Sequence, residues 1–149
     1  MRNETFTNRL TNYFRSGHAG IFVKTHEETS VYDAVKTVAT FIREDRGILI
    51  KVTKWSVASG AFSTKEMGGI LDKSLTSPVA LIDELMSNID KYAGHIIMLC
   101  DFHAFFTDPN PSLIRLLREA YDIMKTANIC LVMTGYNATL PPELQKSYV

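Results

Sequence analysis

The chain has 149 residues, of which 46% are hydrophobic and 21% are charged. This composition is typical of one folded domain and excludes an intrinsically disordered chain. Sixteen Lys and Arg residues balance sixteen Asp and Glu residues, so no net charge attracts a nucleic acid or an anionic membrane surface.

No apolar run reaches the roughly 20 residues of a membrane-spanning helix. The opening stretch, MRNETFTNRL, lacks the apolar core of a signal peptide. Cys100 and Cys130 each lie within an apolar run, which is typical of buried, reduced thiols. We therefore expect a cytoplasmic protein without a membrane segment.

Helical and strand-like patterns alternate through the first half of the chain. Apolar residues at helical spacing predict helices over 4–15 and 30–43, and short β-branched runs predict strands over 20–24 and 48–53. Glycines make 54–76 a loop region with one hairpin or short helix. The predicted buried face of the second helix consists of Val31, Ala34, Val35, Val38, Phe41 and Ile42.

The second half begins with a clear helix start. A Ser-Pro pair at 77–78 supplies an N-cap and a first-turn proline, and the helix that follows is predicted to end before Gly94. A strand is predicted over 95–101. An Asn-Pro pair at 110–111 begins a further helix, and 128–134 forms the next strand.

The predicted strands are apolar throughout instead of alternating with polar residues. Such strands need cover on both faces, which the intervening helices supply. The sequence therefore predicts a single three-layer α/β/α domain with a mostly parallel sheet of four to five strands. Ligands of such sheets bind beyond the carboxyl ends of the strands.

The turn after the first strand reads Thr25-His26-Glu27-Glu28. A nucleotide-binding fold of this class carries the glycine-rich loop GxxxxGK[ST] here, whose backbone N–H groups surround the phosphates. This turn has no glycine, and it has two carboxylates where a phosphate would bind. Because like charges repel, phosphate binding at this turn is disfavoured.

The third strand runs into Asp101, a pattern typical of the Walker B strand whose Asp holds Mg²⁺. The next residue is Phe102, where ATPases usually have a catalytic Glu. An Asp that only caps a turn is therefore the favoured interpretation. Thr134 and Asn137 follow the fourth strand and suit either a γ-phosphate contact or an ordinary turn.

Several motifs together resemble one protein family. They are T-x-E-E before a helix, a strand running into D-F-H, the segments LIRLLREAYDIM and ICLVMT, and then LPPEL. The chain resembles the N-terminal region of AAA-type ATPases of the cyanobacterial and chloroplast open-reading-frame kind. The similarity runs from about residue 4 to the end and is densest in Thr25–Glu28, Ile96–His103 and Leu140–Leu144.

The resemblance implies a degenerate RecA-like domain, with P-loop NTPase topology but no Walker A loop, that precedes a true AAA module. ATP and Mg²⁺ are then expected only in that downstream module, and residues 1–149 are expected to be the N-terminal part of a longer ATPase. No GxxxxGK[ST] motif occurs in the chain. The ATPase activity of such a parent protein therefore does not extend to these residues.

His26, Glu28, Asp101 and His103 would form a mixed metal-binding set if the first and third strands were close together. They come from separate loops and lack a recognised ligand spacing, so we expect no metal. The favoured interpretation is that Thr25, Glu27 and Glu28 cap the following helix. Carboxylates there are stabilised by its positive end by about 0.3–1 kcal/mol.

Aromatic residues gather at the ends of two predicted strands. Phe102, Phe105 and Phe106 follow the third strand, and Trp55 follows the second. The favoured interpretation is that they close the end of the core. The alternative is an exposed patch for a partner, such as the companion ATPase domain.

Three functions remain open from the sequence. The preferred hypothesis is a non-catalytic domain of an AAA ATPase that serves assembly or partner and substrate recognition. The second is a divergent nucleotide- or metal-dependent hydrolase that uses Asp101, Glu28 and His26. The third is a small stand-alone adaptor, self-associating through an uncovered sheet edge.

Overall fold

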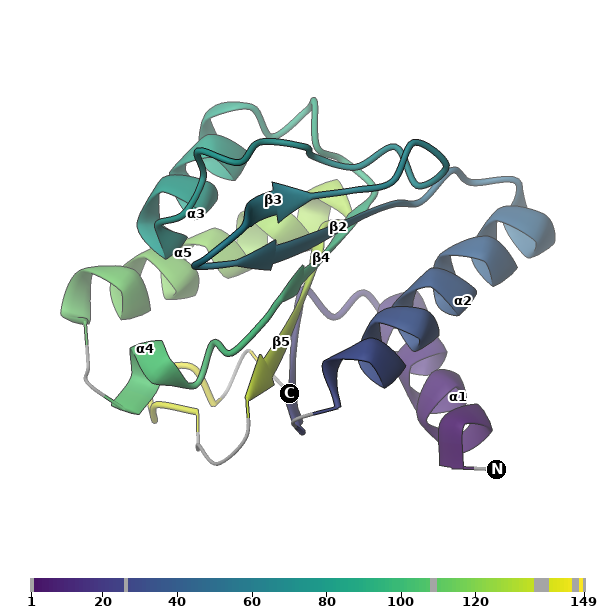
Figure 1. The fold of residues 1–149 in the computed structure, drawn as a ribbon, viewed down its shortest axis with the longest axis horizontal. Helices are drawn as coiled ribbons and strands as arrows, with labels where there is room; N and C mark the ends of the chain where they lie inside the picture. Colours follow the sequence, from purple (N-terminus) through teal and green to yellow (C-terminus); the bar gives the residue numbers. More distant parts are fainter. Residues whose placement is uncertain (1, 26, 108–109, 136–139, 146–147, 149) are drawn as a thin grey trace.

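A computed structural model describes residues 2–25, 27–107, 110–135, 140–145 and 148 of the chain. In these ranges the chain forms ten helices and strands, whose arrangement Figure 1 shows. In chain order they are α1 (Arg2–Arg15), β1 (Gly20–Lys24), α2 (Glu28–Arg46), β2 (Lys51–Ser56), β3 (Gly60–Phe62), α3 (Pro78–Ser87), β4 (His95–Leu99), α4 (Ala104–Thr107), α5 (Pro111–Ala127) and β5 (Cys130–Gly135).

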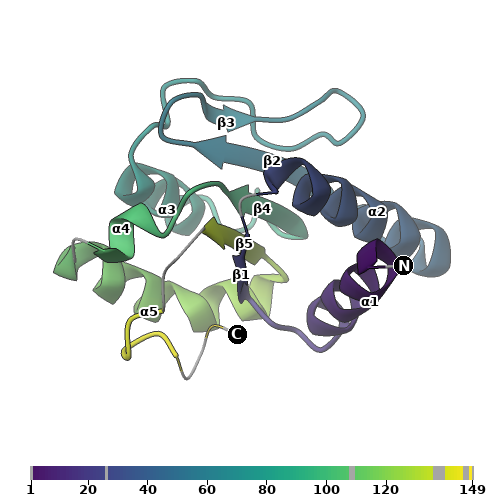
Figure 2. The same ribbon diagram turned by 60° about the horizontal axis from the view of Figure 1, so that its bottom comes forward.

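The strands form one sheet in the order β1-β5-β4-β2-β3. The first four of these are parallel to one another, and β3 pairs antiparallel with β2 as a hairpin. Figure 2 shows α1 and α2 on one face of the sheet and α3 and α5 on the other. The predicted three-layer, mostly parallel α/β/α fold is confirmed.

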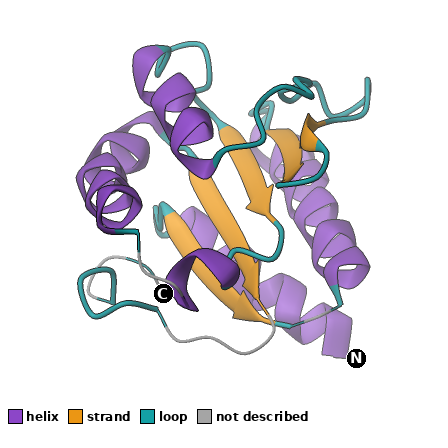
Figure 3. Cartoon of the chain, turned by 60° about the vertical axis from the view of Figure 1, so that its left-hand side comes forward, coloured by secondary structure: helices purple, strands orange, loops and turns teal. Residues whose placement is uncertain are grey.

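The central strands contribute side chains to both faces in turn. Along β4, Ile96 and Met98 belong to the apolar cluster under α1 and α2. Ile97 and Leu99 belong to the cluster under α3 and α5. Because both faces are covered, as Figure 3 also shows, the strand is apolar at every position after His95.

Two predicted boundaries are wrong by several residues. The second strand begins at Lys51 and not at residue 48, because its register is set by pairing with β4, and Ile48 and Leu49 are exposed. Its shift brings Trp55 inside β2. The helix predicted to reach Gly94 ends at Ser87.

The predicted buried face of α2 is also wrong at one residue. Phe41 is exposed, and the guanidinium of Arg15 lies 5.0 Å from the centroid of its ring. The other five predicted residues of that face are buried. A third boundary differs slightly, because β4 ends at Leu99 and Asp101 lies in the turn that follows.

The two helix starts predicted from Ser-Pro and Asn-Pro pairs are confirmed. The Ser77 hydroxyl accepts a hydrogen bond from the Ala80 N–H at 3.4 Å, and the Asn110 side chain accepts one from the Leu113 N–H at 3.2 Å. Each bond satisfies an N–H group that the helix itself leaves without a partner.

The sheet ends differently at its two edges. Beyond β3, Ala61 and Asp72 exchange both backbone N–H···O bonds at 2.9 Å, so this edge is covered by the chain itself. Within the described residues, β1 forms the opposite edge. Among those residues no helix is long and apolar enough to cross a membrane.

Candidate functional site

The carboxyl ends of the parallel strands meet at one edge of the sheet, and β5 lies between β1 and β4. Thr134 on β5 pairs in register with Val23 of β1. Its hydroxyl accepts a hydrogen bond from the Asp101 N–H at 3.3 Å. Thr134 therefore links the ends of β1 and β4, which do not touch as neighbouring strands. Asn137 and His26 lie outside the described residues.

The turn after β1 is acidic, and its side-chain hydrogen bond joins two residues of the turn itself. The Thr25 hydroxyl accepts a hydrogen bond from the Glu27 N–H at 2.9 Å. Glu27 is at the N-cap of α2 but makes no side-chain cap bond, and Glu28 lies in the first helical turn. The structure therefore gives no side-chain cap of α2, although Glu27 occupies the N-cap position. The charges of Glu27 and Glu28 still lie at the positive end of the helix.

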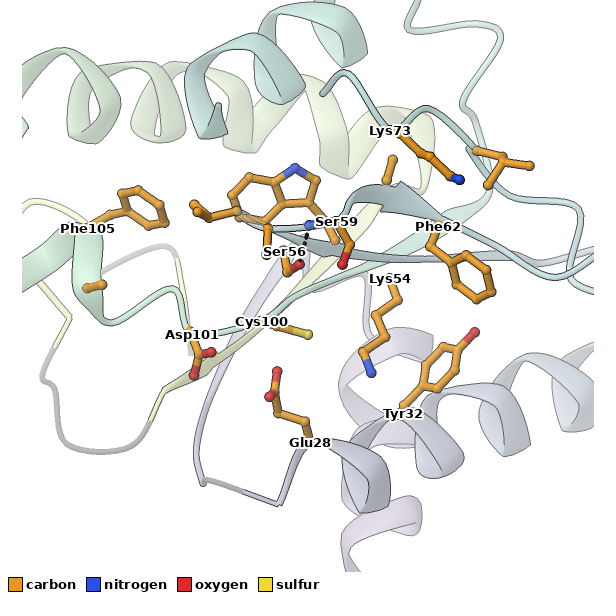
Figure 4. A pocket seen from close by; sticks show the side chains of 16 residues that line it. Glu28, Tyr32, Lys54, Ser56, Ser59, Phe62, Lys73, Cys100, Asp101 and Phe105 are labelled. Carbon is orange, nitrogen blue, oxygen red and sulfur yellow. Dashed lines mark hydrogen bonds between the residues drawn. The ribbon is translucent and has the colours of Figure 1, made fainter. Parts of the chain in front are cut away.

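Glu28 extends from α2 towards the turn after β4, as Figure 4 shows. Burial, and then a hydrogen bond to the Glu28 carboxylate, raise the pKa of the Cys100 thiol well above its usual value. The thiol is therefore protonated at neutral pH. A protonated, buried thiol is a poor nucleophile.

Asp101 has a backbone φ of 53°, in the left-handed region that few residues other than glycine adopt. Hydrogen bonds to Thr134 hold the turn: the Asp101 N–H donates to its hydroxyl, and the Phe102 N–H donates to its carbonyl at 2.8 Å. The exposed carboxylate of Asp101 faces the same space as Glu28 (Figure 4).

His103 lies on the turn after β4 and packs against the end of β5. A Cβ atom at Gly135 would lie 2.6 Å from the His103 Cβ atom, so only glycine allows this approach. In the part of the chain that the structure describes, no group of three or more His, Cys, Asp or Glu side chains is placed to hold a metal ion.

Three of the four aromatic candidates are buried: Trp55 and Phe102 fully, and Phe106 almost fully. The Trp55 and Phe102 rings meet edge to face with their centroids 6.1 Å apart. These residues close the core, as the favoured interpretation has it. Phe105 is only half-buried and lies, with one side of Trp55, at the edge of an open cavity.

This cavity, here called the hairpin groove, has a volume of about 1000 Å³. It lies between the first turns of α2, the β2–β3 hairpin and the turn after β4 (Figure 4). Its lining includes Glu28, Tyr32, Lys54, Trp55, Val57, Phe62, Leu71, Lys73, Cys100, Asp101 and Phe105. The groove thus joins Glu28 and Asp101, which the sequence indicated, to a hairpin that it left undecided.

The sequence missed the residues that form the rim of the groove. Val57, Phe62 and Leu71 are apolar yet 54%, 46% and 64% exposed. Their presence in a glycine-containing loop region was the available signal, since such a region normally exposes polar side chains. Only the hairpin and the pairing of Ala61 with Asp72 bring them together.

Comparison with known proteins identifies the family and the fold of the chain. Residues 6–149 match the family model of the SpoVK-like AAA ATPase N-terminal domain. The structure is similar to the ORC1 protein of Aeropyrum pernix solved in complex with DNA. The TM-score is 0.55 at 14% identity, over 97% of this chain and 42% of that one.

It is also similar to Drosophila ORC bound to poly(dA/dT) DNA and Cdc6. Here the TM-score is 0.52 at 13% identity, over 99% of this chain and 28% of that one. The chain thus spans less than half the length of either solved chain. No curated protein matches the sequence significantly. The likeness supports the predicted RecA-like, P-loop NTPase-like topology.

Proposed function

Because the chain belongs to the family of SpoVK-like AAA ATPase N-terminal domains, we propose that it is a non-catalytic domain for assembly or for partner and substrate recognition. ATP and Mg²⁺ would then bind a downstream AAA module, which is also the first partner to consider. That residues 1–149 form one degenerate domain of a longer ATPase is part of the proposal. So is the narrower relation to the cyanobacterial and chloroplast ATPases.

The observation that carries the proposal is the turn between β1 and α2. It has no glycine to turn backbone N–H groups towards a phosphate, and Glu27 and Glu28 stand at the helix start. Two like charges about 4 Å apart repel by about 4 kcal/mol at an effective dielectric constant of about 20. A triphosphate would meet this repulsion from both carboxylates.

A recognition role also has support at the neighbouring strand ends. The rim of the hairpin groove exposes large apolar side chains side by side. Exposed apolar patches on soluble domains commonly mark binding surfaces. The DNA in the two solved structures has no counterpart in this proposal, because the chain carries equal numbers of acidic and basic residues.

Calorimetry with MgATP tests the non-catalytic role. We expect no binding tighter than about 1 mM, which corresponds to roughly −4 kcal/mol. The matched variant Glu27→Gln/Glu28→Gln keeps the side-chain shapes and removes both charges. Wild-type binding tighter than that limit would contradict the proposal.

One observation keeps the hydrolase as a second candidate. Asp101 is held in a left-handed conformation at a strand end, and such strain is often found at functional sites. If MgATP binds the wild-type chain and Asp101→Asn abolishes that binding, the hydrolase is the better assignment. If the substitution changes nothing, the strain serves only the turn.

A further inference from the structure

We propose that the hairpin groove binds a segment of a partner protein that combines large apolar side chains with a basic residue. The apolar side chains would lie against the hairpin, and the basic residue would face Glu28 and Asp101. This inference rests on the proposed recognition function and names the surface and the chemistry through which it acts.

The apolar half of the groove is open and continuous. Val57 from the hairpin loop, Phe62 from β3 and Leu71 from the segment beyond it line the same cavity while remaining about half exposed or more. Below them, the Trp55 and Phe105 rings lie with their centroids 6.2 Å apart. Trp55 is already fully buried, so the apolar area that a partner would remove from water belongs to the three exposed side chains and to the half-buried Phe105.

The groove is rigid where the partner would bind. The Trp55 indole N–H donates to the Leu75 carbonyl at 2.5 Å, which ties β2 to the segment beyond β3. The hairpin loop is closed by a hydrogen bond of 3.0 Å from the Ser59 N–H to the Ser56 hydroxyl. A surface fixed in advance loses little conformational entropy on binding.

The charges of the groove favour a basic partner residue at one end. Within the described residues, neither Glu28 nor Asp101 belongs to an ion pair. The Lys54 ammonium lies 5.2 Å from the centroid of the Tyr32 ring and is partly satisfied there. Figure 4 shows Lys73 on the far side of the groove from the two carboxylates.

A protein segment fits this surface better than a small molecule does. A compact ligand would cover the floor and leave the exposed rim of Val57, Phe62 and Leu71 in water. An extended segment covers both the floor and the rim, and its basic residue reaches Glu28 and Asp101. A second copy of the chain is the competing occupant, and the experiment separates it by mass.

Isothermal calorimetry measures the binding. Trp55 is the only tryptophan of the chain, and it is fully buried beneath the groove, so its fluorescence is a second, indirect probe. The probes are three pools of short synthetic peptides without tryptophan. All three pools contain the apolar residues Leu, Ile, Phe and Val at alternate positions. The other positions are Lys and Arg in the apolar–basic pool, Asp and Glu in the apolar–acidic pool, and Ser and Gly in the neutral pool. We expect the apolar–basic pool to bind about tenfold tighter than the apolar–acidic pool.

Two variants locate the binding. Leu71→Ser changes an exposed rim residue and should weaken the apolar–basic pool about tenfold. Its matched control is Ile123→Ser on α5, where the side chain is 48% exposed and outside the groove. Asp101→Asn should remove the preference for basic peptides, with Asp122→Asn as its control.

The inference is overturned if no pool binds, if the acidic pool binds as well as the basic one, or if Leu71→Ser has no effect. It is also overturned if light scattering shows a dimer that Leu71→Ser dissociates, because the occupant is then a second copy. MgATP binding to the wild-type chain would contradict the proposed function alone, since the apolar rim that Leu71→Ser tests is separate from the β1–α2 turn.

Discussion

The turn after β1 and the hairpin groove beside β2 lie at the same edge of one sheet, yet they differ in every property that governs binding. The turn is short, acidic and held by its own bonds, as between Thr25 and Glu27. The groove is wide, mostly apolar and edged by exposed side chains such as Leu71. The RecA-like fold thus brings both features to the carboxyl ends of its strands, and under the proposed function only the groove binds a partner.

The difference shows that fold and site vary independently. The parallel strands place their carboxyl ends together whatever residues follow them. The chemistry is then decided by a few residues after each strand: Glu27 and Glu28 after β1, Asp101 after β4, and the apolar hairpin after β2. Each of the following predictions changes one side of this comparison.

The largest effect is expected from Trp55→Ala, which removes the floor of the groove. The indole is fully buried, packs on Phe102 and donates to the Leu75 carbonyl. We expect the free energy of unfolding to fall by about 3–5 kcal/mol. Urea unfolding followed by circular dichroism measures it.

The control for this change is Leu71→Ser on the rim of the same groove. Because Leu71 is 64% exposed, its loss should change stability by no more than about 0.5 kcal/mol. Equal losses in the two variants would show that floor and rim are not distinct, and the description of the groove as a fixed surface would fail.

The second prediction compares two glycines that share a φ of +68°. A Cβ atom at Gly60 in the hairpin would lie 2.7 Å from the backbone oxygens of Asp72 and Lys73, whereas at Gly47 nothing lies within 4 Å. Gly47→Ala should therefore show only the conformational cost of about 1 kcal/mol. Gly60→Ala should lose about 1–3 kcal/mol more, from steric crowding.

Thermal and urea unfolding of the two variants provide the measurement. Because the backbone angle is the same, the difference between them isolates the contact of the hairpin with the segment beyond it. Equal stabilities would mean that this segment moves freely, and the groove would then not be fixed in advance.

The third prediction concerns the amino ends of the parallel strands, where His95 begins β4. Burial lowers the pKa of His95 below its usual 6.5, and Lys51 adds to this. The unfolded chain therefore binds more protons than the folded chain below that pH. Stability should be complete above pH 6.5 and fall as the pH decreases through the folded-state pKa.

Urea unfolding at a series of pH values measures this slope. His95→Gln should flatten it, whereas His18→Gln leaves His95 in place and should retain it. An unchanged slope in the His95 variant would assign the acid sensitivity to carboxylates, such as those of the β1–α2 turn, and would weaken the contrast between the two ends of the sheet.

Much of the fold was predictable because it depends on local patterns. Helix starts at Ser77 and Asn110 follow from capping chemistry that the sequence states directly. The parallel sheet follows from the predominantly apolar runs in β1, β4 and β5. The second strand was misplaced because Ile48 and Leu49 look like strand residues, while the true register depends on pairing between Lys51 and His95.

The candidate site was predictable only in part, and for the same reason. Glu28 lies in the turn after the first predicted strand and Asp101 ends the third, so their shared edge could be inferred. The groove depends on Ala61 pairing with Asp72 and on Trp55 reaching Leu75, which are contacts between residues far apart in the chain. No periodicity in the sequence reports such pairings.

The smallest effect is expected at the β1–α2 turn itself. Glu27 is at the N-cap of α2 without a side-chain cap bond, whereas Asp is among the best N-cap residues. Glu27→Asp keeps the charge and shortens the side chain, so it should raise the free energy of unfolding by about 0.5–1 kcal/mol. Ser77→Asp at α3, where a cap bond already exists, is the control and should change little.

The same variant also tests phosphate binding, because it changes the helix cap and leaves the negative charge of residue 27 in place. If acidity alone disfavours phosphate, Glu27→Asp should remain without MgATP affinity although its helix is more stable, and Glu27→Ser should gain the cap while losing one charge. A loss of stability in Glu27→Asp would instead show that the longer side chain makes a contact that the turn requires. The acidic turn would then be a structural element first and a barrier to phosphate only as a consequence.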